Sequence, residues 1–253
     1  MSDPATTGPD QGMPEVSVVV PVFGHVDQLR PLCDRIAASV GPGPIEIVLV
    51  DDAGPAPSGD AVRRLATDMP WVRALHLRER AGGIGARAAG AATARAPIVV
   101  TIDADLEYAP EDIGGLVAAV RSGSDLVSGV RRDQVGRSAT RRLASPLIRH
   151  LGRPSLGIAP TDFGCGLKAW RADLGAQALA WEGPGGELRF AIALHRLAQH
   201  YTEVPVSWQR GAHPSTYSGR ARLRLALHLL AAARPTGHRA PRRGRPPITA
   251  PSP

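Results

Sequence analysis

The sequence predicts an α/β protein with a mostly parallel central sheet flanked by helices, and two patterns carry this prediction. Short runs rich in Val and Ile, such as VSVVVPV and IEIVLV, recur through the first half of the chain. The segments between these runs place apolar residues at the spacing of an amphipathic helix. Strands that are apolar along their whole length and alternate with helices are typical of a parallel sheet covered on both faces.

The first half of the chain contains the most regular of these elements. Strands are expected at residues 16–22, 45–50, 72–77 and 97–102. Helices are expected at residues 26–40, about 62–66, about 84–95 and 110–123. The last of these helices opens with a proline and ends on a glycine, as helix termini commonly do.

The second half is less regular, and a single domain is expected to cover residues 15–233. Within it we expect a strand near 125–130, helices near 138–151 and 187–199, and an amphipathic helix at 219–233. The amphipathic segment has leucines on one face and arginines on another, so it either packs on the domain or lies at a lipid surface.

Both ends of the chain and the cysteine usage bear on localisation. Residues 1–14 and 234–253 are rich in Pro, Gly and polar residues and are expected to be disordered tails. The N-terminus lacks the apolar stretch of a secretory signal, and no apolar run approaches the roughly 20 residues of a membrane span. Cys33 and Cys165 show neither metal-ligand nor disulfide spacing. A cytoplasmic protein, in peripheral contact with the inner face of a membrane, is therefore expected.

The positive charge of the chain is concentrated near its C-terminus. The formal net charge is +7, and nine arginines with no acidic residue lie from Val204 onward. Without these nine charges the net charge of residues 1–203 is −2. This distribution disfavours a nucleic-acid-binding domain and favours an anionic partner, either phosphates or a lipid surface, met by the C-terminal basic segment.

Acidic pairs follow two of the expected strands. Asp51 and Asp52 follow the second strand, and Asp103 and Asp105 follow the fourth. Because parallel strands end at the same edge of a sheet, where ligands bind, both pairs are expected there. Closely spaced carboxylates suit a divalent cation, which can also bridge a diphosphate. The residues alone leave two interpretations open: a metal-dependent enzyme acting on a nucleotide or phosphate, or a D-x-D sequence that only forms a turn or cap.

Six ordered sequence blocks resemble those of family 2 glycosyltransferases, in particular the dolichyl- or polyprenyl-phosphate sugar synthase branch. The blocks are SVVVPVFGH, IEIVLVDDAGP, IVVTIDADLEYAPEDI, DLVSGVRRD, TDFGCGLKAWRADL and EVPVSW. They span roughly residues 16–220. The resemblance implies a GT-A (Rossmann-like) fold, a nucleotide-sugar donor, Mg²⁺ or Mn²⁺ as cofactor, and inversion at the anomeric carbon.

The resemblance also implies roles for individual residues. The positions matched to the nucleotide-sugar donor are Pro21, Phe23, Asp52, Ala104, Arg131 and Arg210. The positions matched to the metal are Asp103, Asp105 and Glu107. Asp103 and Asp105 are also expected to be catalytic, together with Asp162 and Glu187, which fall near acceptor-side acids of relatives. Glu187 could equally be an acid favoured by the dipole of a helix N-terminus.

The sequence departs from the family pattern in one phosphate-binding stretch. In GAHPSTYSGR, Thr216 occupies a position where the family has a lysine that contacts phosphate. Either Arg220 or Arg222 substitutes for this lysine, or donor binding is weakened.

The function implied by the resemblance is transfer of a sugar from a nucleoside diphosphate sugar to an acceptor, a polyprenyl phosphate. Two alternatives remain open: a small-molecule or glycan acceptor, and a degenerate, non-catalytic homologue that binds anionic lipid. A sugar nucleotidyltransferase is disfavoured, because PVFGHVDQL lacks a glycine-rich basic loop after the first strand.

Overall fold

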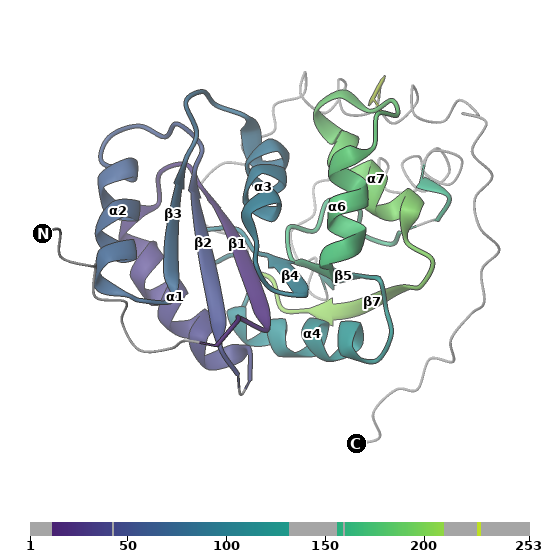
Figure 1. Cartoon of the computed structure of the whole chain (residues 1–253), viewed down its shortest axis with the longest axis horizontal. Helices are drawn as coiled ribbons and strands as arrows, with labels where there is room; N and C mark the ends of the chain where they lie inside the picture. The colour runs from purple at the N-terminus through teal and green to yellow at the C-terminus, as the bar shows by residue number, and fades with distance from the viewer. Residues whose placement is uncertain (1–11, 42, 132–155, 159, 210–226, 229–253) are drawn as a thin grey trace, which may run out of the picture.

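The computed structural model describes residues 12–41, 43–131, 156–158, 160–209 and 227–228 of the chain (Figure 1). Its strands are β1 (Val16–Val22), β2 (Ile45–Asp51), β3 (Val72–His76), β4 (Ile98–Thr101), β5 (Leu126–Arg131), β6 (Lys168–Arg171) and β7 (Tyr201–Val206). The described strands form one seven-stranded sheet in the order β3-β2-β1-β4-β6-β5-β7.

All the strand pairs are parallel except those made by β6. Strand β1 pairs in parallel with β2 and β4, β2 pairs in parallel with β3, and β5 pairs in parallel with β7. Strand β6 lies between β4 and β5 and is antiparallel to both. The start of β6 therefore lies at the edge of the sheet where the other strands end. The predicted α/β class with a mostly parallel sheet is confirmed.

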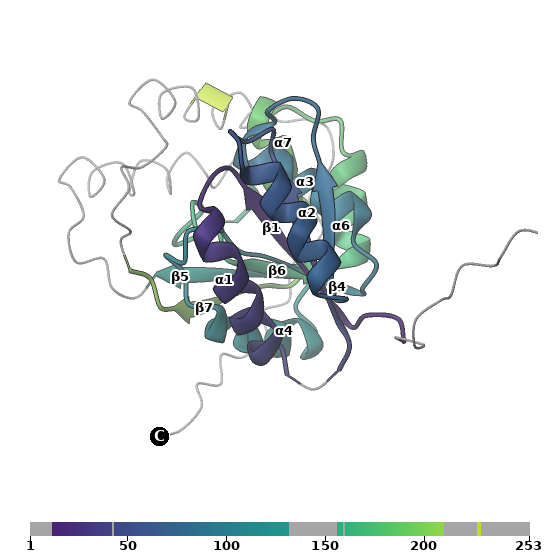
Figure 2. The same cartoon turned by 90° about the vertical axis from the view of Figure 1, so that its left-hand side faces the viewer.

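The helices form two layers, one on each face of the sheet (Figures 1 and 2). They are α1 (Val26–Ser39), α2 (Ser58–Asp68), α3 (Gly82–Thr93), α4 (Ile113–Arg121), α6 (Ala172–Ala180) and α7 (Arg189–Leu197), with 3-10 turns η1 (Pro110–Asp112) and η2 (Gly186–Leu188). Side chains alternate along β1, so that Val18 and Val20 pack with α1, α2 and α4 while Val19 packs with α3, α6 and α7.

The elements expected in the first half of the chain occur at the predicted places, although α2 is longer than the short helix expected at 62–66. Helix α6 follows β6 directly and was not predicted. The helix expected at 138–151 and nearly all of the segment 219–233 lie outside the described residues, as do residues 1–11 and 234–253. None of the helices in the described part of the chain has both the length and the apolar character needed to span a bilayer.

Helix α3 packs unusually close to the sheet because its sequence, GGIGARAAGAAT, consists mostly of Gly and Ala. A Cβ atom placed on Gly90 would lie 2.3 Å from Val19 Cγ1 and 2.9 Å from Val50 Cγ2. No side chain fits between α3 and strands β1 and β2 at this point. The close contact holds α3 directly against β1 and β2.

We predict that Gly90→Ala lowers the free energy of unfolding by about 1–3 kcal/mol, because the added methyl group overpacks the contact with Val19. Helix propensity alone would favour alanine by about 1 kcal/mol. The matched control is Gly115→Ala in α4, where a Cβ atom would lie 3.8 Å from its nearest neighbour, Val204 Cγ1. Urea unfolding of both variants measures the difference. A Gly90→Ala protein as stable as the Gly115→Ala protein would contradict the packing account.

A buried carboxylate connects β1, β2 and β3 at the opposite edge of the sheet. Glu46 Oε1 accepts hydrogen bonds from Ser17 Oγ and from Arg95 N, each at 2.6 Å, and Oε2 pairs with Arg73 Nη1 at 2.8 Å. Burial alone would raise the pKa of Glu46, but these hydrogen bonds and the charge of Arg73 outweigh burial and hold the pKa below its usual value.

We predict that Glu46→Gln lowers the free energy of unfolding by about 1–3 kcal/mol near neutral pH. Because the folded-state pKa is depressed, the stabilisation is complete above the unfolded-state pKa, about 4.3, and is lost as the pH falls through the folded-state value. Urea unfolding across acidic pH should therefore show the wild type and the variant converging. The exposed Glu79→Gln serves as the control. A difference that stays constant down to about pH 3 would contradict the role of the Glu46 carboxylate.

Candidate active site

The acidic residues singled out by the sequence lie at the carboxyl edge of the parallel strands. Strand β1 runs in register with β2 and β4, so the segments that follow these strands leave the sheet at one edge. Helix α3 contacts both acidic segments: the N–H of Ala81, at its start, donates to Asp52 Oδ1 at 2.6 Å, and Arg87 forms an ion pair with Asp103. One helix thus connects the two acidic groups.

Backbone strain is concentrated at the same edge. Among the described residues other than glycine, positive φ angles occur at His25 (56°), Ala53 (49°) and Leu106 (55°). These residues follow β1, β2 and β4 respectively. Conformations of this kind are unfavourable for residues with a Cβ atom and are found preferentially at functional sites. Their position supports a binding site at this edge.

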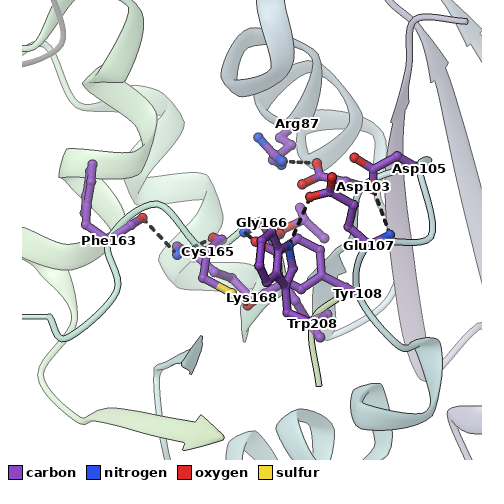
Figure 3. A network of polar contacts seen from close by, with 12 residues as sticks. Arg87, Asp103, Asp105, Glu107, Tyr108, Phe163, Cys165, Gly166, Lys168 and Trp208 are labelled. Atoms are coloured by element: carbon purple, nitrogen blue, oxygen red, sulfur yellow. Dashed lines mark hydrogen bonds and ion pairs between the residues drawn. The ribbon is translucent and has the colours of Figure 1, made fainter. Parts of the chain in front are cut away.

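The acidic segment after β4 is held in place by the segment that follows β7. Tyr108 forms an antiparallel bridge with Trp208, and Gln209 N donates to the Glu107 carbonyl at 2.8 Å. Glu107 Oε2 also accepts a hydrogen bond from Trp208 Nε1 at 3.0 Å (Figure 3). Trp208 and Gln209, which follow β7, therefore position Glu107.

The two aspartates of the D-x-D sequence have different surroundings (Figure 3). Asp103 Oδ1 pairs with Arg87 Nη2, whereas Asp105 Oδ1 accepts a hydrogen bond from Glu107 N at 3.0 Å. Burial raises the pKa of Asp105 above its usual value, and the nearby charge of Asp103 raises it further. Negative charge at Asp105 is therefore only partly compensated by the protein. The intervening Ala104 is buried.

The donor set at this edge fits a divalent cation that is shared with a phosphate-containing ligand. No group of three or more His, Cys, Asp or Glu side chains that could hold a metal ion occurs among the described residues. Mg²⁺, however, is commonly bound by one or two carboxylates together with oxygen atoms of a phosphate ligand. Asp105 can supply such a carboxylate. That Asp103, Asp105 and Glu107 all bind one ion stays a prediction.

The residues expected at the nucleobase lie where β1 and β2 end. Phe23 is 39% exposed, and the guanidinium carbon of Arg80 lies 3.8 Å from the centre of its ring. Asp52 is buried, with its backbone N–H donating to the Val22 carbonyl at 3.0 Å. Pro21 is partly buried in β1 opposite Val50. An aromatic ring and a carboxylate at adjacent strand ends can stack on and hydrogen-bond to a base.

Arg131 and Asp162, which the sequence analysis assigned to donor binding and catalysis, form a bidentate ion pair. Arg131 Nε and Nη2 donate to the two carboxylate oxygens of Asp162 at 2.6 and 2.7 Å. The side chains are only 20% and 5% exposed. Burial would raise the pKa of Asp162, but the hydrogen bonds and charge of Arg131 outweigh it and hold the pKa below its usual value. A carboxylate in this state is a poor general base.

A buried lysine that the sequence analysis missed supports the segment between Asp162 and β6. Lys168 is the only lysine in the chain, and its Nζ donates to the carbonyls of Cys165 and Phe163 at 2.6 and 3.3 Å (Figure 3). Gly166 N donates to Tyr108 Oη at 3.0 Å. These bonds place the segment against Tyr108. The signal in the sequence was a single lysine within an apolar run of a chain that otherwise uses arginine.

The remaining predicted residues lie away from these contacts or outside the described residues. Glu187 is an exposed residue of η2, which leads into α7, so the helix-terminus interpretation fits its position. Arg210, Thr216, Arg220 and Arg222 lie outside the described residues. Arg87 was also missed, although it is the only charged residue in the sequence of α3.

Comparison with known proteins establishes the family. The family model described as Glycosyl transferase family 2 matches residues 17–173, and the chain belongs to this family. Proteins named undecaprenyl-phosphate 4-deoxy-4-formamido-L-arabinose transferase, from Pseudomonas fluorescens (strain Pf0-1) and Pseudomonas syringae pv. syringae (strain B728a), are each 34% identical over 220 residues. These alignments cover 85% of this chain and 64% of the relatives, so the chain spans less than two thirds of their length.

Solved structures of glycosyltransferases share the fold. Glucosyl-3-phosphoglycerate synthase from Mycobacterium tuberculosis, in complex with Mn²⁺, UDP-glucose and phosphoglyceric acid, matches with a TM-score of 0.63 and 20% identity over 87% of this chain and 80% of that one. A mannosyltransferase from Pyrobaculum calidifontis, in complex with GDP-mannose and Mn²⁺, matches with a TM-score of 0.58 and 22% identity over 90% and 65%. The predicted GT-A fold is confirmed.

We predict that Asp162→Asn lowers the free energy of unfolding by about 3–5 kcal/mol, because it leaves the charge of Arg131 buried without its partner. The matched control is Asp173→Asn, since Asp173 forms a bidentate pair with Arg171 that is more than half exposed on both sides. The control should change stability by less than about 1 kcal/mol. Urea unfolding measures both variants. Equal effects of the two substitutions would contradict a buried, structural role for Asp162.

Proposed function

We propose that this protein transfers a sugar from a nucleoside diphosphate sugar to a polyprenyl phosphate, with inversion and with a bound divalent cation. The observation that carries the proposal is the convergence of Asp52, Asp105 and Arg131 on the carboxyl edge of one sheet, within a family 2 glycosyltransferase domain. Ligands of open parallel sheets bind at this edge.

The donor is oriented by residues at the ends of four strands. Phe23 and Asp52 hold the nucleobase, because a ring and a carboxylate at the ends of β1 and β2 can stack on it and accept its N–H groups. Pro21 and Ala104 shape the nucleoside pocket. Arg131, at the end of β5, directs its charge toward the phosphates while Asp162 holds its side chain in place.

Asp105 supplies a carboxylate for Mg²⁺ or Mn²⁺, which would neutralise the charge that grows on the diphosphate as it leaves. The burial and like-charge repulsion that raise the pKa of Asp105 are relieved when a cation is bound to it. The proteins of known structure with Mn²⁺ and a nucleotide sugar support this assignment by analogy of fold.

The acceptor phosphate attacks the anomeric carbon from the face opposite the diphosphate. A new bond forms between a phosphate oxygen and this carbon, the bond to the diphosphate oxygen breaks, and its electron pair leaves with the nucleoside diphosphate. A phosphate acceptor is already ionised at neutral pH, so no general base is required. This chemistry agrees with an Asp162 that is committed to Arg131, and it leaves no required catalytic role for Glu187.

The polyprenyl phosphate acceptor is supported by the relatives, which are named undecaprenyl-phosphate transferases. A peripheral membrane contact through the C-terminal basic segment would bring the domain to such an acceptor. Arg220 and Arg222 would contribute to this membrane contact by binding lipid phosphate groups.

We predict that sugar transfer from UDP-, GDP- or dTDP-sugars to polyprenyl phosphate in vesicles is lost on adding EDTA and falls by about 100-fold or more in Asp105→Asn. The matched control is Asp60→Asn, because Asp60 is an exposed acid on α2 paired with Arg63. Asp60→Asn should retain wild-type transfer, measured as radiolabelled lipid product.

Transfer to a soluble glycan or small molecule, with none to the lipid, would contradict the proposed polyprenyl phosphate acceptor but not the proposed transfer of sugar from a nucleoside diphosphate sugar. A wild-type protein that neither binds a nucleotide sugar nor transfers from one would contradict the proposed enzyme and favour a non-catalytic lipid-binding role.

A further inference from the structure

Arg87 is the feature of the site that the proposed function leaves unexplained. It lies on α3, and its guanidinium crosses to the end of β4, where Nη2 donates to Asp103 Oδ1 (Figure 3). Neither side chain is fully exposed: 18% of the Arg87 side chain and 30% of the Asp103 side chain are accessible. The ion pair is therefore partly buried and not a freely exposed surface pair.

Both oxygens of the Asp103 carboxylate have close neighbours. Oδ1 is engaged by Arg87, and Oδ2 lies against Gly166, where an added Cβ atom would be 2.2 Å from Oδ2 and 3.0 Å from Arg87 Nη2. Only glycine permits the segment before β6 to approach the ion pair this closely. Asp105, by contrast, accepts a hydrogen bond from the backbone N–H of Glu107 at Oδ1.

The two aspartates are therefore suited to different tasks. Asp105 can offer its carboxylate to a cation, whereas Asp103 is already paired with an arginine. An arginine that is paired with a carboxylate keeps its positive charge, and the planar guanidinium matches the oxygens of a phosphate. Arg87 thus brings a fixed positive charge to the site beside the residue that would hold the cation.

A nucleoside diphosphate brings more negative charge than one divalent cation neutralises, and this charge increases as the sugar departs. A positively charged donor that is already oriented before the reaction stabilises such charge effectively. Arg87 is oriented by Asp103, and α3 is itself fixed to the sheet by the close contact at Gly90. Both features keep the guanidinium in place when a ligand enters.

We propose that Arg87 binds the diphosphate of the nucleotide-sugar donor, and that Asp103 acts by positioning Arg87. This inference rests on the proposed function, because it assigns a residue to the same donor. It adds a phosphate contact from within the described core of the domain, in addition to Arg131. Asp103 is a positioning residue in this account, and Asp105 provides the carboxylate for the cation.

Calorimetric binding of nucleotides in the presence of Mn²⁺ tests the role of Arg87 without any assay of transfer. The probe is whichever of UDP, GDP and dTDP binds the wild type with the highest affinity, compared with the corresponding nucleoside. Arg87→Met should weaken binding of the diphosphate by about 10- to 100-fold and change binding of the nucleoside by less than about threefold. Arg87→Lys, which keeps the charge but not the fork, should give an intermediate loss.

The matched control is Arg95→Met, because Arg95 is an exposed arginine just beyond the other end of α3 and only its backbone N–H contacts Glu46. It should bind the diphosphate like the wild type. Thermal unfolding of each variant checks that it is folded. If Arg87→Met does not fold, the intermediate loss in Arg87→Lys decides the question. A folded Arg87→Met or Arg87→Lys protein that binds the diphosphate with wild-type affinity would overturn the proposal.

A double-mutant cycle separates positioning by Asp103 from direct binding of the cation. If Asp103 acts through Arg87, Asp103→Asn weakens diphosphate binding in the wild type but adds less than about threefold in the Arg87→Met background. If Asp103 binds the cation directly, the full loss persists in that background, and its positioning role is refuted. A wild-type protein that binds no nucleoside diphosphate at all would instead refute the proposed function, and this inference with it.

Discussion

The structure depends on how negative charge is compensated at one edge of a sheet. Parallel strands deliver their carboxyl ends to the same place, so acids that are distant in sequence repel one another once the sheet forms. Arg87 neutralises Asp103 and Arg131 neutralises Asp162, both through partly or fully buried ion pairs. Asp105 is left with charge that the described residues compensate less completely, and this difference is the reason for proposing that a cation binds there.

The antiparallel strand β6 makes this arrangement possible. Because β6 runs against its neighbours, the segment that enters it, and not the one that leaves it, lies at the edge where the parallel strands end. The segment brings Asp162 to Arg131 and Gly166 to Asp103. Lys168 stabilises the segment by donating a hydrogen bond to the Cys165 carbonyl. A fully parallel sheet would place this segment at the opposite edge. The reversal is thus the topological feature that completes the site.

Local sequence predicts the parts of this protein that local physics determines. The strands β1, β2 and β4 are rich in β-branched residues, and the acids that follow β2 and β4 could be placed at one edge from topology alone. Helix α6 was missed because it follows β6 without an intervening turn. The pairs Arg87–Asp103 and Arg131–Asp162 join residues 16 and 31 positions apart, and no periodic pattern encodes such contacts. The pairing of Asp103 and Asp162 with these arginines was therefore not accessible to sequence reasoning.

The central claim is that the carboxyl edge of this sheet binds a nucleoside diphosphate together with a divalent cation at Asp105. The most direct measurement is an anomalous-difference map from crystals grown with Mn²⁺ and the nucleoside diphosphate that binds best. The account predicts a manganese peak in direct contact with the Asp105 carboxylate and with diphosphate oxygens, and with Asp103 still paired to Arg87. A peak bound to Asp103 and not to Asp105, or a nucleotide bound elsewhere, would contradict it.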